Sequence, residues 1–249
     1  MIHSPARRVT PFGPASGTAS AAPIGLQQAT ATFSQAGLPV SLAIDGLLDT
    51  TSTTNGWAIH PLIVDQTAAF ESVADTPAFA GGTALTFTLN HTYYNDLGPF
   101  EHALGRFRLS VTTADRSTFA DGMTTGGNVG LPAIWTVLDP AAYSSANSIT
   151  ITKLADKSLL VTENDTPHDV YTVLAYTALT GLTGFRLEVM EDPSLPSDGP
   201  GLQDSNGNFV LSEFSVDAAP VPEPTTLLLR GTTAVGLAAA RRLSRRRSA

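Results

Sequence analysis

Apolar and polar residues alternate along much of the chain between residues 24 and 218, and clusters of Gly, Pro, Asn and Asp separate the alternating stretches. A period of two is typical of β-strands that bury one face and expose the other. No helix of convincing length is predicted before residue 224, so the body is expected to be all-β. The predicted strands are 29–33, 68–73, 84–89, 106–113, 148–154, 158–162, 169–178, 184–190 and 209–216.

The clearest alternation is in the segment 106–113, where Phe107, Leu109 and Val111 share one face and two arginines share the other. The segment 184–190 repeats this pattern. Its predicted inward residues are Phe185, Leu187 and Val189, and its predicted outward residues are Arg186 and Glu188. Half-solvated antiparallel sheets require such alternation, and no internal repeat of a propeller or solenoid is visible. The pattern therefore predicts a single antiparallel β-sandwich.

Composition and charge narrow the range of possible functions. The 249 residues are 42% hydrophobic and include no Cys, which suits one globular domain with short tails and excludes a disulfide scaffold. Residues 24–218 hold 21 of the 22 acidic residues but only 6 of the 14 basic ones. Such a body repels phosphates, so nucleic-acid binding is not expected, whereas an acidic surface suits calcium. The outward arginines, Arg106 and Arg108, are expected to pair with nearby carboxylates.

The two ends of the chain differ from the body. Residues 1–23 are rich in Pro, Ala, Ser and Gly and are predicted to be disordered. Residues 18–23 suit the end of an export signal, and we hypothesise that a longer reading frame supplies the apolar part of that signal. At the other end, Pro224 precedes an apolar run from 225 to 240, which predicts a hydrophobic helix. A cluster of arginines follows this run.

This carboxyl-terminal arrangement resembles the PEP-CTERM sorting signal of Gram-negative bacteria, over residues 221–249. The resemblance implies export, temporary anchoring of the helix in the membrane, processing by an exosortase, and delivery to the cell surface or extracellular matrix. The helix departs from the family pattern at Arg230, because a charge there opposes membrane insertion. The residues that match the signal are Pro222, Glu223, Pro224, Arg241, Arg242, Arg245, Arg246 and Arg247.

The body resembles the discoidin-like, galactose-binding-type modules of secreted planctomycete proteins. The segments that carry the resemblance are 43–46 with 56–59, 102–110, and 199–202 with 206–214. The resemblance implies a jelly-roll β-sandwich over 24–218 that binds carbohydrate through loops at one end. Residues 1–23 and 219–249 are then a disordered segment and a sorting tail. The cytochrome c module that often accompanies this family is not expected, because its haem attachment needs Cys.

A calcium site is expected where an early loop meets the last strand. Asp45 lies in a tight turn with Gly46, and Asp49 and several Thr and Ser residues follow, which supplies the oxygen ligands that Ca²⁺ prefers. In discoidin-like folds a structural calcium sits where such a loop meets a Glu of the final strand, and Glu213 fits that position. Without a bulge, Glu213 shares the strand phase of Phe209 and Leu211. The alternative is an ordinary turn with Glu213 in solvent.

Two regions are candidates for contacts with a sugar. Trp57 has an aromatic face that suits a pyranose ring, although its apolar neighbours favour a place in the core. The loop 91–105 lies between two strong strands, and Tyr93, Tyr94 and His102 are its expected ligand contacts. The alternative is that the tyrosines cover a sheet edge and that the histidines of this loop are solvated. The polar and aromatic residues of the loop are His91, Tyr93, Tyr94, Asn95, Phe100, Glu101 and His102.

No sequence signature of an enzyme is present. The chain has no nucleophile elbow, phosphate-binding loop, zinc-helix motif or Cys–His pair, and nothing selects two of its carboxylates as a glycosidase pair. We therefore expect an exported, non-catalytic surface protein that binds an extracellular glycan. The alternatives are a polysaccharide-active enzyme and a purely structural matrix protein without a specific ligand.

Overall fold

The computed structural model describes residues 20–94, 102–162 and 168–221. Every strand pairing among these residues is antiparallel. The helices found in these ranges are short 3-10 turns: η1 (Val40–Ile44), η2 (Arg116–Thr118), η3 (Pro132–Ile134) and η4 (Pro196–Asp198). The predicted all-β, antiparallel class is confirmed.

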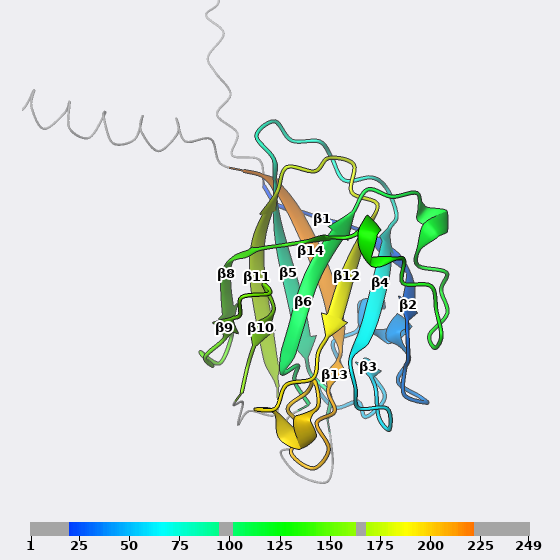
Figure 1. Cartoon of the computed structure of the whole chain (residues 1–249), viewed down its shortest axis with the longest axis vertical. Coiled ribbons are helices and arrows are strands. Elements are labelled where there is room, and N and C mark those ends of the chain that lie inside the picture. The colour runs from blue at the N-terminus through cyan, green and yellow to red at the C-terminus, as the bar shows by residue number, and fades with distance from the viewer. Residues whose placement is uncertain (1–19, 95–101, 163–167, 222–249) are drawn as a thin grey trace, which may run out of the picture.

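The strands form two main sheets and a short ribbon (Figure 1). The five-stranded sheet has the order β1 (Ala22–Pro23), β14 (Glu213–Pro220), β5 (Thr83–His91), β11 (Asp169–Thr177) and β8 (Pro140–Ser145). The seven-stranded sheet has the order β2 (Leu26–Ala31), β4 (Gln66–Ser72), β12 (Gly184–Val189), β6 (Arg106–Thr112), β10 (Leu159–Leu160) and β9 (Thr152–Lys153), and β7 (Thr136–Val137) also pairs with β6. The ribbon joins β3 (Trp57–Ala58) and β13 (Val210–Leu211).

The two sheets pack face to face over one apolar core. Phe87 of the five-stranded sheet meets Phe185 of the seven-stranded sheet edge to face, with ring centroids 6.0 Å apart. Phe70 of β4 stacks on Phe214 of β14 at 4.7 Å. The inward residues predicted for 106–113 and 184–190 all belong to this core, because alternation places every second side chain on the buried face.

The boundaries of some elements differ from the predictions. Only Thr152–Lys153 of the predicted strand 148–154 pairs as a strand. Strand β8 was missed, because it begins with Pro and two Ala residues, which are weak strand formers. The body begins with β1, which pairs with β14 two residues before the predicted domain start. The predicted helix and sorting signal lie outside the described residues.

The long segment that links β6 to β7 in the chain covers the outer face of the seven-stranded sheet (Figure 1). Phe119 and Trp135 of this segment form a second small core with Ala69 of β4. A Cβ atom at position 184 would lie 2.3 Å from the Phe119 ring, so Gly184 allows this segment to approach the sheet. Arg186 points outward as predicted, but it is only 6% exposed, because its guanidinium lies 5.3 Å from the Trp135 ring centroid.

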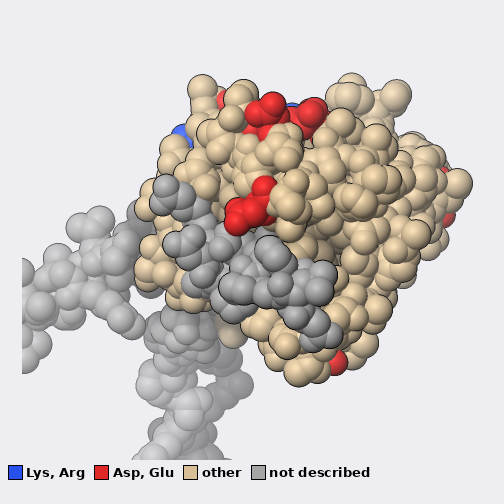
Figure 2. Space-filling view, turned by 90° about the horizontal axis from the view of Figure 1, so that it is seen from below, with Lys and Arg blue, Asp and Glu red and all other residues tan. Residues whose placement is uncertain are grey.

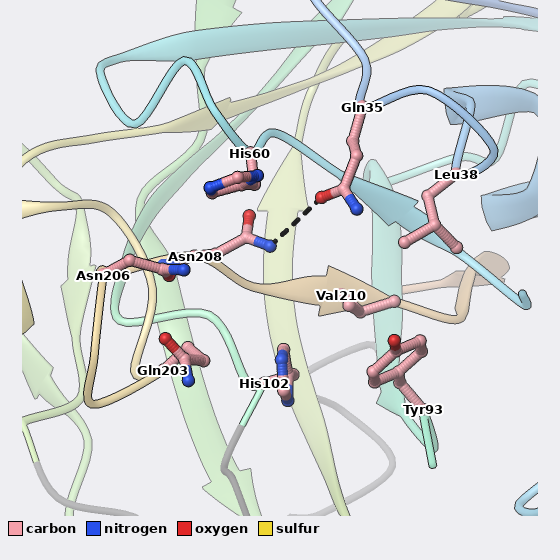
Figure 3. Close-up of a pocket in the computed structure, with 9 residues that line it drawn as sticks. All are labelled: Gln35, Leu38, His60, Tyr93, His102, Gln203, Asn206, Asn208 and Val210. Atoms are coloured by element: carbon pink, nitrogen blue, oxygen red, sulfur yellow. Dashed lines mark hydrogen bonds between the residues drawn. The ribbon is translucent and has the colours of Figure 1, made fainter. Parts of the chain in front are cut away.

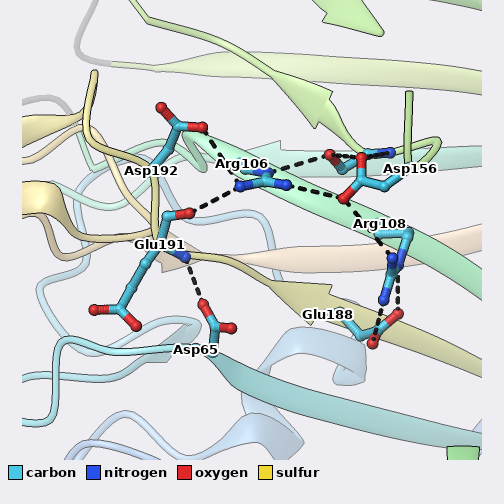
Figure 4. Close-up of polar contacts among 8 residues, drawn as sticks. Asp65, Arg106, Arg108, Asp156, Glu188, Glu191 and Asp192 are labelled. Atoms are coloured by element: carbon cyan, nitrogen blue, oxygen red, sulfur yellow. Dashed lines mark hydrogen bonds and ion pairs between the residues drawn. The ribbon is translucent and has the colours of Figure 1, made fainter. Parts of the chain in front are cut away.

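An ion-pair network continues along the same face (Figure 4). Arg106 contacts Asp156 at 2.9 Å and Asp192 at 3.5 Å, which joins β6 to the turn before β10 and to the segment after β12. Arg108 donates two hydrogen bonds to the carboxylate of Glu188, at 2.9 and 3.0 Å. The predicted pairing of the two outward arginines with carboxylates is confirmed.

Candidate functional site

A pocket of about 220 Å³ lies at the end of the sandwich that holds β3 and β13. This end is at the bottom of Figure 1, and Figure 2 views it from below, where uncharged side chains dominate and basic side chains appear only at the margin. The described residues that line the pocket carry amide, imidazole, phenol or apolar groups and no carboxylate. They are Gln35, Leu38, His60, Tyr93, His102, Gln203, Asn206, Asn208 and Val210 (Figure 3).

Asn208 connects three walls of the pocket. Its side-chain oxygen accepts a hydrogen bond from the backbone N–H of Ile59 at 3.1 Å, and its amide nitrogen donates to the Gln35 side-chain oxygen at 3.3 Å. The backbone around it is closely packed, because a Cβ atom at position 201 would lie 2.2 Å from the Asn208 carbonyl oxygen. Gly201 therefore allows the two segments to meet, and the pocket is held by the backbone as well as by side chains.

A tight turn places two further amides at the rim. The Gln203 side-chain oxygen accepts from the N–H and the hydroxyl of Ser205 at 3.1 and 2.8 Å. The Asn206 side-chain oxygen accepts from the N–H of Asn208 at 2.9 Å. Because these bonds use the oxygen of each amide, they fix the orientation of its amino group as well.

Two predicted ligand contacts come together in the opposite wall. Tyr93 and His102 line the pocket with ring centroids 4.9 Å apart, although residues 95–101 between them lie outside the described ranges. Burial raises the pKa of the Tyr93 hydroxyl. Tyr94 is 42% exposed and does not line the pocket. Two neighbouring tyrosines that the sequence predicts to have the same role therefore differ in the structure, because only Tyr93 lines the pocket.

Two aromatic residues from the candidate regions, Trp57 and His91, are buried. Trp57 is fully buried, its Nε1 donates to the Phe33 carbonyl at 3.1 Å, and its ring meets Phe209 edge to face. It is a core residue, and its proposed contact with a sugar is wrong. His91 was expected to be solvated but is 3% exposed, and its Nε2 accepts a hydrogen bond from the N–H of Leu104. Burial lowers the pKa of His91 to about 4.

Most pocket residues were missed by the sequence analysis. Gln35, His60 and Asn208 come from three segments far apart in the chain, and only Asn208 lies in a segment that carries the discoidin-like resemblance, 206–214. A further signal is the stretch 203–208, where Gln, Asp, Ser, Asn and Gly predict a tight turn. A turn of that composition does not indicate by itself which of its amides face a ligand.

The loop of the expected calcium site does meet the last strand. Glu213 accepts a hydrogen bond from the N–H of Gly46 at 3.0 Å, beside Asp45. Burial, with a smaller contribution from the charge of Asp45, raises the pKa of Glu213 to about 7. The predicted strand 209–216 is interrupted at Ser212, where β13 ends and β14 begins, so the shared phase expected without a bulge does not hold. Leu211 and Phe214 are both buried, while Glu213 is half-buried.

The fit of these residues to calcium is mixed. Asp49 accepts from the N–H and the hydroxyl of Thr51, so its carboxylate closes a local turn. Asn55 donates to the Asp49 carbonyl, while its own side-chain oxygen is buried without a hydrogen-bond partner among the described residues. An amide oxygen of this kind is a ligand that Ca²⁺ accepts. The described residues contain no group of three or more His, Asp or Glu that is arranged to hold a metal.

Comparisons with known proteins add a likeness in structure only. No family model and no curated protein matches the chain. Among solved structures, a chain of the Streptococcus pneumoniae beta-galactosidase BgaA aligns with a TM-score of 0.45 and 13% identity. The alignment covers 79% of this chain and 98% of that chain. Within the ranges that the structure describes, no helix is long and apolar enough to span a membrane.

Proposed function

We propose that this chain is an exported, non-catalytic surface protein whose discoidin-like jelly-roll body binds a neutral sugar in the pocket at the β3–β13 end. The observation that carries the proposal is a set of three side-chain amino groups. Those of Gln35, Gln203 and Asn206 line the pocket, and their amide oxygens already accept hydrogen bonds from the protein. The amino groups themselves make no hydrogen bond to another described residue, so they are available to sugar hydroxyls.

The rest of the pocket suits the same ligand. Tyr93 supplies an aromatic surface for the C–H face of a sugar ring, and the described lining carries no formal charge apart from any protonation of its two histidines. A volume of about 220 Å³ is below the ~300–1,000 Å³ of pockets for drug-sized ligands, so it favours a single sugar residue. The competing enzyme hypothesis receives less support, because glycosidases need two carboxyl groups and the described lining offers none.

Calcium and the sorting tail complete the proposal. A structural calcium ion would be held by the carboxylates of Asp45 and Glu213, with oxygen atoms of Asp49 and Asn55 as further ligands. The ion would neutralise the two adjoining carboxylates. The tail, with Pro222, Glu223 and Pro224 before the apolar run, would direct the chain to an exosortase and hold it in the membrane before processing. This part rests on the sequence alone.

Sugar binding is tested on the full chain with a glycan array followed by calorimetry, first with calcium and then with a chelator. We expect saturable binding of a neutral sugar, and Tyr93→Ala should weaken it at least tenfold by removing the aromatic wall. Tyr94→Ala is the matched control and should bind as the unchanged chain does. A thermal melt of each variant separates loss of binding from loss of fold.

Three outcomes would contradict the proposal. Absence of binding with and without calcium would favour a structural matrix protein. Equal affinities of the Tyr93 and Tyr94 variants would remove the pocket as the site. Release of shortened sugars from the bound glycan would establish an enzyme instead.

A further inference from the structure

The outer face of the five-stranded sheet carries a row of hydroxyl groups that crosses four strands. Strand pairing places Ser144 of β8 opposite Thr172 of β11, and Thr172 opposite Thr88 of β5. Thr88 in turn lies opposite Ser215 of β14. We call these four residues the hydroxyl row. Neighbouring strands are about 4.8 Å apart, so the row presents a hydroxyl at roughly that interval.

A second row runs beside it, two residues along each strand, and its members are apolar on β8 and β11 only. Leu174 lies opposite Ala142 on one side and Thr86 on the other, and Thr86 lies opposite Asp217. Tyr176, a further two residues along β11, is 47% exposed. On β8 and β11, hydroxyl and C–H surfaces therefore alternate along the strand at about 7 Å, twice the rise per residue of an antiparallel strand, whereas the second row carries a hydroxyl on β5 and a carboxylate on β14.

The hydroxyl row has no partner within the described part of the chain. None of its four hydroxyls makes a hydrogen bond to another described residue, and all four side chains keep part of their surface exposed. This differs from the outer face of the other sheet, where Phe119 and Trp135 cover the strands. The side chains of the row are not required to hold the fold together, so their composition is free to serve another purpose.

Charge restricts what this face can bind. None of β1, β5, β8, β11 and β14 contains Lys or Arg. The formal charges at its outward positions are the carboxylates of Asp217 and Glu213. Such a face repels nucleic acids, anionic polysaccharides and anionic membranes. It is also too polar for the fully buried centre of a stable protein interface, which is depleted of charge and rich in aromatic residues.

We propose that this face is a second carbohydrate-binding surface, which takes the side of an extended neutral polysaccharide. A sugar chain presents hydroxyl groups at its edges and C–H groups on its ring faces, so it matches a hydroxyl row beside Leu174 and Tyr176. Threonine suits this task, because its branched side chain has few rotamers and loses little entropy on binding. The proposal is independent of the pocket. If both sites act on one polymer, they strengthen each other by raising the effective concentration.

The test uses the full chain and insoluble neutral polysaccharides: cellulose, chitin, mannan and a β-1,3-glucan. The measurement is depletion of the protein from solution over a series of polysaccharide amounts. The test variant is Thr88→Val with Thr172→Val, which removes two hydroxyls of the row and keeps both shape and strand propensity. The control is Thr136→Val with Thr152→Val, which removes two exposed strand hydroxyls from the other sheet.

We expect at least one polysaccharide to retain the protein, and the Thr88/Thr172 variant to bind it about tenfold more weakly, as for the loss of two hydrogen bonds. The control variant should bind as the unchanged chain does, and Tyr93→Ala should reduce retention less than the Thr88/Thr172 variant does. Binding of soluble sugar to the Thr88/Thr172 variant should be unchanged, which separates this surface from the pocket.

Several results would overturn the inference. One is no retention by any of the polymers, and another is equal retention of the two threonine variants. Loss of retention in Tyr93→Ala alone would mean that the pocket captures chain ends. A dimer in sedimentation velocity that dissociates in the Thr88/Thr172 variant would identify the face as an interface between two copies of the chain.

Discussion

The two sheets share one core, but their outer faces are completed in different ways. On the seven-stranded sheet, outward Arg106, Arg108 and Arg186 are met by carboxylates and by the Trp135 ring. On the five-stranded sheet, the outward residues include the hydroxyl row, which remains partly exposed. A charged side chain that is covered needs a partner, whereas an exposed hydroxyl is satisfied by water or by a ligand. The comparison indicates that one face supports the fold and that the other is available for binding.

The largest expected effect is on the covered face. Trp135→Ala removes the ring that packs on Phe119 and lies over Arg186, and it should lower the free energy of unfolding by about 3–4 kcal/mol. Tyr176→Ala, on the exposed face, should change it by less than about 0.5 kcal/mol. Urea denaturation measures both. Similar losses in the two variants would contradict the division between the faces.

The second effect concerns the ion pairs of the covered face. Glu188 contacts both Arg108 and Arg186, at 2.9 and 3.1 Å, so Glu188→Gln leaves the nearly buried Arg186 without its carboxylate. We expect a loss of about 1–3 kcal/mol in the free energy of unfolding. Asp139→Asn breaks an exposed pair with Lys153 and should have little effect on the free energy of unfolding, because solvent screens exposed pairs. A larger loss in the Asp139 variant would show that burial does not decide the strength of these pairs.

The third effect is a difference in pH dependence. Burial alone would raise the pKa of Asp156, but hydrogen bonds from Ser158 and Arg106 lower it from 3.8 to about 2. Its stabilisation is therefore present above pH 4 and is lost as the pH falls toward 2. The pKa of Glu213 is raised from 4.5 to about 7, so the folded state keeps a proton that the unfolded chain has released. Stability then falls as the pH rises from 4.5 to 7.

Two variants separate these contributions. Asp156→Asn should flatten the acid limb of a plot of melting temperature against pH, and Glu213→Gln should flatten the limb between pH 4.5 and 7, both measured in chelator. Adding calcium at pH 7.5 should raise the melting temperature of the unchanged chain and not that of Glu213→Gln. An equal rise in both would remove Glu213 from the proposed calcium site.

The smallest effect is expected on the exposed face. The Thr88→Val and Thr172→Val changes should alter the free energy of unfolding by less than about 0.5 kcal/mol, because these hydroxyls have no partner among the described residues. Urea denaturation checks this value. A loss of 2 kcal/mol or more would show that the hydroxyls support the fold, and the contrast between the two faces would disappear.

Much of the fold follows from local patterns, while the site does not. The alternation around Phe107 and Phe185 identifies core strands, because a period of two is a property of consecutive residues. The break at Ser212, which changes the phase of Glu213, was missed because it depends on how β13 and β14 pair with different partners. The amides of the pocket were missed for a similar reason. Gln35 and Asn208 are 173 positions apart and meet only in the folded chain.

The sequence by itself determined the all-β class, the inward face of the main strands, and the pairing of the outward arginines with carboxylates. Each depends on residue type and on spacing along one strand. Only the tertiary structure decided that Tyr93 lines the pocket while Tyr94 does not, that His91 is buried, and that one outer face is covered while the other is exposed. These outcomes depend on which distant segments pack together, because burial is a property of the whole fold and not of neighbouring residues.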